Sequence, residues 1–162
     1  MPAPRRLTVS PLAVLAVLAA LAGCTPPRIP GTDILDTKDT HAVLDVIQAY
    51  GKAMQTRDAQ AVLALVGHDF YDDAGTPDPA DDLDYAKLEQ TLPQDLAKIE
   101  AIRVELTVRS VVVEKDVATA EVLYDAWYRI HTPGGTVPKR VSDVHRMTFK
   151  REAGAWKITS GL

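Results

Sequence analysis

Apolar side chains recur at every third or fourth position in the first half of the chain, a spacing typical of amphipathic helices. The first helix begins at Asp36 or Thr37, either of which can cap it, and its apolar positions are Val43, Leu44, Ile47, Tyr50 and Met54. Asp58 caps a second, shorter helix with the apolar positions Val62, Leu63, Leu65 and Val66. A third helix follows Asp84, is kinked or interrupted by Pro93, and carries Leu88, Leu92, Leu96 and Ile99.

Beyond residue 101 the apolar side chains alternate with polar ones, which predicts β-strands with one buried face. The first strand buries Ile102, Val104, Leu106 and Val108. After a turn at 114–116, the second strand buries Val122, Tyr124, Ala126, Tyr128 and Ile130. A loop at 132–139 leads to a third strand at 140–151, and a turn at 152–155 leads to a fourth at 156–160. Three helices followed by four antiparallel strands predict an α+β domain with the helices packed on one face of the sheet.

The first 24 residues have the layout of a bacterial lipoprotein leader. Arg5 and Arg6 precede an apolar run at 12–21 that is too short to span a bilayer comfortably and is typical of a secretory signal. The tetrapeptide LAGC at 21–24 is similar to a lipobox, in which the cysteine sulfur receives a diacylglyceryl group. We therefore expect residues 1–23 to be removed and Cys24 to carry the lipid. The alternative is an ordinary signal peptide with an incidental cysteine.

The charge of the chain limits its partners. The formal net charge is −4, and loss of Arg5 and Arg6 with the leader lowers it to about −6. Nucleic acid is not expected as a partner, because binding it relies on clustered basic residues. An acidic protein gains nothing from anionic head groups, so attachment to the membrane has to come from the lipid on Cys24. Thr25 is not the aspartate that retains lipoproteins at the inner membrane of enteric bacteria, which favours the outer membrane in a host with two membranes.

The processed chain divides into a short tether and one domain. Residues 24–35 hold three prolines and a glycine, a composition that stays extended. Residues 36–162 are enough for one sizeable core and too few for two. The single cysteine leaves none for an internal disulfide, and no His and Cys spacing supports zinc, so the fold depends on its core.

Two stretches of the sequence carry a resemblance to a known family. They are LDVIQAYGKAMQTRDAQAVLAL at 44–65 and MTFKREAGAWKITSG at 147–161. With the order of the elements, they resemble the nuclear-transport-factor-2-like superfamily (SnoaL-like, cystatin-like cone) over residues 36–162. The resemblance implies a strongly bent, mainly antiparallel sheet that wraps the helices and leaves a pocket at the open end of the cone. Ketosteroid isomerase, polyketide cyclases, dehydratases and protein-binding transport factors share this fold, so the fold alone does not choose a function.

Asp143 and His145 are the candidate catalytic pair. Both lie on the same face of the third predicted strand, about 7 Å apart at positions i and i+2. A carboxylate beside an imidazole can transfer protons near neutral pH. The alternative is that both lie at the solvent end of the strand and pair with each other or with Arg140 and Arg146. A counterpart of the base aspartate of the isomerase branch is not evident in this sequence.

Three tyrosines are candidates for the wall of the pocket. Tyr50, Tyr71 and Tyr128 could donate hydrogen bonds to a developing oxyanion, which is the division of labour in the isomerase branch of the superfamily. Alternatively, Tyr50 and Tyr128 are core aromatic residues whose hydroxyls lie at the boundary of the core.

The segment HDFYDDAGTPDPADDLDY at 68–85 holds seven aspartates, and it admits three interpretations. Calcium takes six to eight oxygen ligands in flexible geometry, so one interpretation is a calcium site formed by Asp72, Asp73, Asp78, Asp81 and Asp82. A second is a solvated rim loop made of caps and turns, anchored inward by Phe70 and Tyr71. The third is a lid that contacts substrate. No other cofactor is expected.

Trp127 and Leu123 fall on the strand face opposite Tyr128. Members of the superfamily often dimerise through the outer face of the sheet, so this apolar pair favours a homodimer, although a single Trp on a partly covered face accounts for it equally well.

The function expected from these observations is that of a lipid-anchored envelope protein. Its cone-shaped domain would bind a small apolar ligand or a protein partner without catalysis. The alternatives are an isomerase or cyclase that uses Asp143 and His145, and a structural or assembly lipoprotein.

Overall fold

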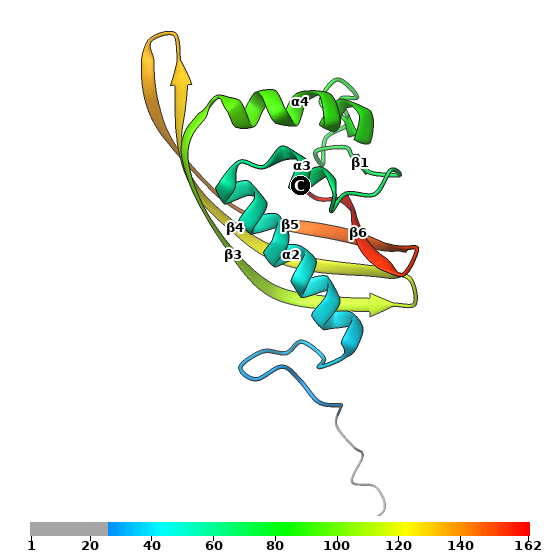
Figure 1. Ribbon diagram of the computed structural model, residues 1–162. Helices are drawn as coiled ribbons and strands as arrows, with labels where there is room; N and C mark the ends of the chain where they lie inside the picture. Colours follow the sequence, from blue (N-terminus) through cyan, green and yellow to red (C-terminus); the bar gives the residue numbers. More distant parts are fainter. Residues whose placement is uncertain (1–25) are drawn as a thin grey trace, which may run out of the picture.

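The computed structural model describes residues 26–162 (Figure 1). The expected leader, the lipobox and Cys24 lie outside the described residues. Among the helices within 26–162, none combines the length and apolar character needed to cross a membrane.

Three helices precede the main sheet, and each is capped by a side chain that the sequence offers at that position. Thr37 caps α2 (Lys38–Thr56), Asp58 caps α3 (Ala59–Leu63) and Asp84 caps α4 (Tyr85–Ala97). Each capping oxygen accepts a hydrogen bond from a backbone N–H three residues on, which satisfies a donor that the first turn leaves unpaired. Pro93 lies inside α4, and the helix continues past it.

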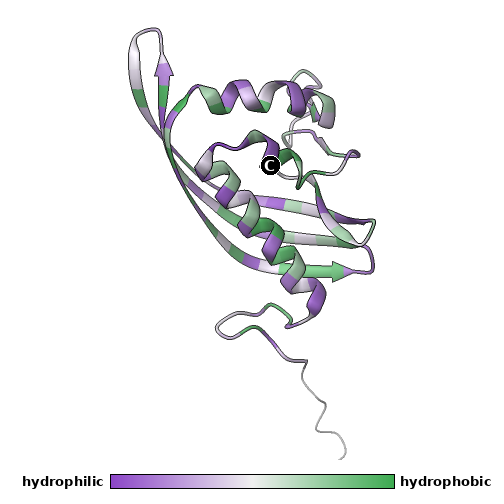
Figure 2. Ribbon diagram, viewed as in Figure 1, coloured by the Kyte–Doolittle hydropathy of each residue, from purple (hydrophilic) through white to green (hydrophobic). Residues whose placement is uncertain are grey.

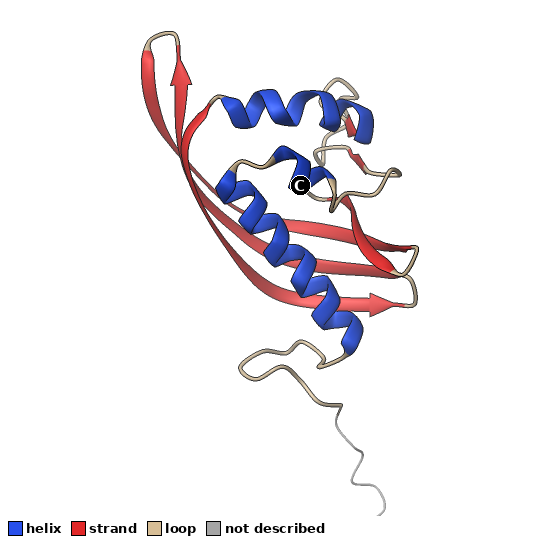
Figure 3. Cartoon of the chain, in the orientation of Figure 1, coloured by secondary structure: helices blue, strands red, loops and turns tan. Residues whose placement is uncertain are grey.

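Four antiparallel strands form one sheet in the order β3-β4-β5-β6. They are β3 (Ile99–Glu114), β4 (Val117–Thr132), β5 (Gly135–Glu152) and β6 (Ala155–Ser160). The α+β prediction is confirmed, and the first three strands form a long, strongly bent ribbon (Figure 3). The loop expected at 132–139 is largely part of β5, because β4 and β5 pair up to Thr132 and Gly135.

The concave face of the sheet packs against α2 (Figure 1). Apolar and polar residues alternate along both α2 and the strands, as the hydropathy colouring shows (Figure 2). Val43 and Ile47 of α2 are fully buried together with Phe149 and Ile158 of the sheet. Burial of each such side chain stabilises the fold by about 1.5–3 kcal/mol. A shift of register between Val108 and Ser110 turns Val111 inward, which strict alternation did not predict.

The packed part of the chain begins before Asp36, where the sequence analysis placed the end of the tether. Arg28 and Leu35 form an antiparallel bridge, and Ile34 is only 4% exposed within the core. The apolar Ile34 thus brings the last part of the proline-containing segment onto the domain.

The aspartate-rich segment also contains structure that the sequence did not predict. Its two ends pair as short antiparallel strands, β1 (Tyr71–Asp72) and β2 (Leu83–Asp84). Phe70 is buried as expected, but Tyr71 is 54% exposed, so the prediction that both aromatics anchor the loop inward is wrong for Tyr71. Neighbouring residues of a strand point to opposite sides, so Phe70 and Tyr71 cannot both face the core.

Candidate functional site

A cavity of about 340 Å³ lies between α4, the second half of α2 and the concave face of β4 and β5. Leucine, valine and methionine side chains from all three helices form most of its wall, namely Met54, Val62, Leu88 and Leu92. On the sheet side the wall is formed by Tyr124 and Tyr128 of β4 and by Val141 and His145 of β5. A mainly apolar cavity with a few polar groups is the usual form of a small-molecule site.

Three tyrosine hydroxyls meet in this cavity. Tyr50 comes from α2, and the alternation of β4 places Tyr124 and Tyr128 on its inner face. The Tyr124 and Tyr128 hydroxyls hydrogen-bond to each other. Within residues 26–162, no hydrogen-bond partner is present for the Tyr50 hydroxyl, although Tyr50 is only 6% exposed. The sequence analysis singled out Tyr50 and Tyr128 but missed Tyr124, which shares the inward face of β4 with Tyr128.

Burial determines the protonation of these phenols. It raises the pKa of Tyr50 well above its usual range, with a smaller contribution from nearby Tyr128. Burial likewise raises the pKa of Tyr124, and its hydrogen bond to Tyr128 raises this pKa further. The two phenols therefore keep their protons at neutral pH and offer a ligand hydrogen-bond donors.

His145 and Asp143 share a face of β5 but have different surroundings. The His145 ring is half-buried in the cavity wall and stacks on Tyr124, with ring centroids 5.2 Å apart and planes 29° apart. Asp143 is exposed, and its carboxylate accepts a hydrogen bond from the backbone N–H of Val144. Among the described residues, no hydrogen bond or ion pair joins Asp143 to His145. The candidate dyad is therefore not assembled in this structure.

The two neighbouring arginines do not pair with Asp143 or His145 either. Arg140 makes a two-pronged ion pair with Asp125 of β4, and this interaction lowers the pKa of the Asp125 carboxyl. Arg146 lies 3.6 Å from Glu121. Both arginines and their partners lie on the outer face of the sheet, because the polar positions of β4 and β5 point there.

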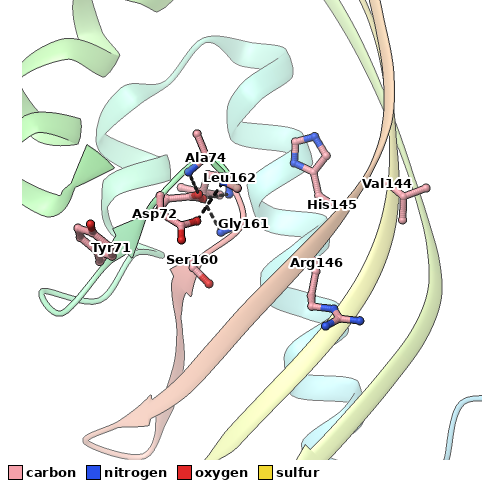
Figure 4. Close-up of a pocket in the computed structure, with 11 residues that line it drawn as sticks. Tyr71, Asp72, Ala74, Val144, His145, Arg146, Ser160, Gly161 and Leu162 are labelled. Carbon is pink, nitrogen blue, oxygen red and sulfur yellow. Dashed lines mark hydrogen bonds between the residues drawn. The ribbon is translucent and has the colours of Figure 1, made fainter. Parts of the chain in front are cut away.

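A larger groove of about 640 Å³, called the outer groove below, lies outside the cavity. It runs between the loop at 71–75 and residues 144–146 of β5, just before the part of β5 that pairs with β6. Figure 4 shows His145 facing the Ser160–Leu162 segment across it, while Tyr71 points away. Tyr71 lines this outer groove and not the cavity with Tyr50 and Tyr128. Its hydroxyl donates to Asp82.

Asp72 connects the loop to the end of the sheet. One carboxylate oxygen accepts hydrogen bonds from the backbone N–H groups of Gly161 and Leu162, at 2.7 and 3.2 Å. The other accepts from the N–H of Ala74 at 3.0 Å (Figure 4). Gly161 has φ +87°, and a Cβ there would lie 2.2 Å from the carbonyl oxygen of Arg146, so the position requires glycine.

The remaining carboxylates of the proposed calcium set satisfy local donors. Asp73 and Asp78 each accept from a backbone N–H two residues on, which is the geometry of an Asx turn. Asp81 accepts from the Thr76 hydroxyl, and Asp82 accepts from Tyr71. In the described part of the chain, no three Asp, Glu, His or Cys side chains gather in a metal-binding arrangement. The calcium interpretation thus has no support from the geometry, and the loop is organised by caps and turns.

On the outer face of the sheet, Trp127 is 37% exposed and is covered by two arginines. The guanidinium groups of Arg103 and Arg140 lie 5.7 and 4.8 Å from its ring centre. Cation–π contacts of this kind stabilise an exposed aromatic by about 0.5–1 kcal/mol. They account for Trp127 without a second copy of the chain.

Residues 43–161 match the SnoaL-like domain family. The chain belongs to this family. The match covers every element that lines the cavity, from the second turn of α2 to β6. A search of curated proteins finds no match to the chain.

Solved structures share the SnoaL-like fold at low sequence identity. A conserved protein from Planctomyces limnophilus is 15% identical with a TM-score of 0.65, covering 75% of this chain and 91% of its own. A ketosteroid isomerase-like protein from Erwinia carotovora atroseptica is 16% identical with a TM-score of 0.63, covering 76% and 93%. A hexachlorocyclohexane dehydrochlorinase of type 2 is 12% identical with a TM-score of 0.61, covering 75% and 81%. At these identities the similarity establishes the cone-shaped fold of nuclear transport factor 2 and no shared chemistry.

Proposed function

We propose that the cavity binds a small apolar molecule that carries one hydrogen-bond acceptor, and that the protein does this as a lipid-anchored component of the cell envelope. The observation that carries the proposal is the Tyr50 hydroxyl, which opens into a mainly apolar cavity and has no partner within residues 26–162. A carbonyl or ether oxygen on the ligand would supply that partner.

The energetics favour an acceptor over a purely apolar ligand. An apolar ligand that covers the Tyr50 hydroxyl would leave it without a partner, at a cost of about 1–3 kcal/mol, whereas a ligand with an acceptor avoids this cost. Tyr124 and Tyr128 strengthen the preference, since only one of their two protons lies between the two oxygens. The second proton remains for a ligand.

A matched pair of probes tests this proposal. α-Tetralone and tetralin have the same fused rings, but only the tetralone has a carbonyl oxygen. We expect the purified protein to bind α-tetralone about fivefold more tightly, the equivalent of about 1 kcal/mol for one hydrogen bond. Tyr50→Phe should reduce that preference, whereas Tyr71→Phe, on the outer groove, should leave it unchanged. Equal affinity for the two probes in the wild-type protein would contradict the proposal.

The position of the cavity supports its use by a membrane-anchored protein. Cys24 precedes Arg28, the first residue with a described backbone bridge, by four residues, which reach about 14 Å when extended. A lipid on Cys24 would therefore hold the base of the domain close to the membrane, the outer one in a host with two. Tyr50 lies about 18 Å along α2 from its first residue, Lys38, so the cavity is at the end of the helix away from the anchor.

Proton transfer at His145 is the second candidate function. Its ring is in the cavity wall beside the tyrosine hydroxyls, and histidine side chains exchange protons near neutral pH. In such a reaction the imidazole would remove a proton from the carbon next to a carbonyl, the tyrosines would stabilise the enolate oxygen, and the imidazolium would return the proton to another carbon. Asp143 has no part in this scheme, because it is exposed and outside the wall.

Deuterium exchange distinguishes this second function from binding alone. If His145 acts as a base, the protein in D₂O should exchange the protons next to the carbonyl of β-tetralone faster than buffer does. His145→Gln should abolish the acceleration and Asp143→Asn should keep it. Exchange at the buffer rate would leave ligand binding as the function of the cavity.

A further inference from the structure

The cavity and the outer groove adjoin. His145 and Leu162 are in the wall of both, and they are the residues that the two walls share. His145 reaches this position from β5, and Leu162 follows β6. The imidazole and the leucine side chain therefore form the partition between an inner and an outer space.

The two spaces differ in chemistry. The inner wall is mainly apolar, with the tyrosine hydroxyls as its principal donors. The groove is lined by Asp73 of the loop. Arg146 of β5, Ser160 and the His145 imidazole also line it (Figure 4). One side of the partition suits a hydrocarbon and the other suits a polar group.

Contacts with neighbouring residues hold Leu162 in its place in the partition. Asp72 binds the backbone N–H of Leu162, and the close approach of Gly161 to Arg146 brings this segment against β5. The imidazole is supported on its other side by Tyr124. Contacts from Asp72 and Tyr124 thus hold Leu162 and His145 in place where the two spaces adjoin.

We propose that the cavity and the groove together bind one amphiphile, with its hydrocarbon chain in the cavity and a neutral, hydroxylated head group in the groove. The molecule lies between His145 and Leu162. This inference rests on the proposed binding function of the cavity and defines the class of its ligand.

The charges of the groove determine the choice of head group. Asp73 on one wall already accepts from the backbone N–H of Gly75, and Arg146 on the other already lies 3.6 Å from Glu121, so neither needs a counter-charge from the head group. A polyol can accept from the arginine and donate to the aspartate. Its hydroxyls also match Ser160, which both donates and accepts.

Two decanoyl esters test the proposal. 1-Monodecanoin has a glyceryl head, and methyl decanoate has the same chain and ester without the hydroxyls. We expect monodecanoin to bind the purified protein about 25-fold more tightly, as two additional hydrogen bonds at about fivefold each would give. Shortening its chain should weaken binding about fourfold per methylene removed.

A pair of serine variants locates the head group. Ser160 lines the groove, and Ser142 is exposed on the same sheet outside the cavity and the groove. Ser160→Tyr should fill the groove and remove the advantage of monodecanoin while keeping the affinity for methyl decanoate. Ser142→Tyr should leave both affinities unchanged.

Chemical shifts in the wild-type protein provide a readout that does not depend on a variant folding. Monodecanoin should shift both the Met54 methyl signal in the cavity and the Ser160 amide signal in the groove, whereas methyl decanoate should shift mainly that of Met54. Binding of both esters with equal affinity, and with no shift at Ser160, would overturn the amphiphile and leave the cavity as an apolar binding site. Binding of neither ester would overturn the amphiphile, and failure of the tetralones as well would overturn the proposed function.

Discussion

The hydroxyl groups of Tyr124 and Tyr128 hydrogen-bond to each other, although the two residues are four positions apart on β4. On a flat strand their Cα atoms would be about 13 Å apart and their side chains parallel. The sheet is strongly bent (Figure 1), and this curvature brings the two hydroxyls together on its concave face. The curvature of the cone thus produces the polar end of the cavity.

The buried phenols predict a loss of stability at alkaline pH. Because the pKa of Tyr50 is raised in the folded state, its contribution is fully present below about pH 10, the pKa of an unfolded tyrosine. Above that pH the unfolded chain releases a proton that the folded protein retains, so stability falls as pH rises toward the folded pKa. Urea unfolding between pH 9 and 12 should show little slope from Tyr50 below about pH 10 and a slope approaching about 1.4 kcal/mol per pH unit above it. Tyr50→Phe should reduce the slope, and an unchanged slope would contradict the account.

Asp72 is predicted to stabilise the fold far more than its neighbour Asp73. It accepts three backbone hydrogen bonds, two of them from the segment after β6, whereas Asp73 accepts one within its own turn. We expect Asp72→Ala to lower the free energy of unfolding by about 2 kcal/mol and Asp73→Ala by about 0.5 kcal/mol, measured by urea denaturation. Hydrogen exchange at Gly161 and Leu162 should accelerate only in the first variant. Equal losses would show that Asp72 does not hold this segment.

Two glycines with the same backbone conformation separate strain from steric clash. Gly154 and Gly161 both have φ +87°, but only at Gly161 would a Cβ meet a backbone atom. Gly154→Ala should cost about 1 kcal/mol from backbone strain. Gly161→Ala should cost at least about 3 kcal/mol, because the Arg146 carbonyl must also move. Thermal unfolding of both variants measures the difference, and similar melting temperatures would contradict the close approach.

If Cys24 carries a lipid, the protein should be found in the membrane fraction of lysed cells. Cys24→Ser removes the sulfur that would carry the diacylglyceryl group, so the protein should leave the membrane fraction. Thr25→Ser, next to it, should stay with the membrane. Retention of the Cys24→Ser protein in washed membranes would rule out the lipid as its anchor.

The features predicted from sequence are those set by nearby residues. The caps at Asp58 and Asp84 and the inward face of β4 follow from short-range chemistry and from the period of two. The outward position of Tyr71 was missed, because it depends on the pairing of β1 with β2 across the aspartate-rich loop.

The candidate site was harder to predict for the same reason. Calcium was one of three interpretations of the segment that holds Asp72, and local sequence did not reveal that this carboxylate accepts from residues 89 and 90 positions away. Periodicity placed Tyr124 on the right face, whereas its contact with Tyr128 comes from the bend of the sheet. Asp143 and His145 share a strand face, but Asp143 is exposed and His145 is half-buried in the cavity wall. This difference depends on how far the helices extend over the sheet.

The central claim is that the cavity beneath α4 holds the ligand, and a titration with α-tetralone tests it most directly. Thr91 lines the cavity, and Gln94, in the same helix, is exposed outside it. Thr91→Trp should fill the space and weaken α-tetralone binding at least tenfold, whereas Gln94→Trp should bind as the wild-type protein does. Undiminished binding by the Thr91→Trp protein, or no binding by the wild-type protein, would contradict the account.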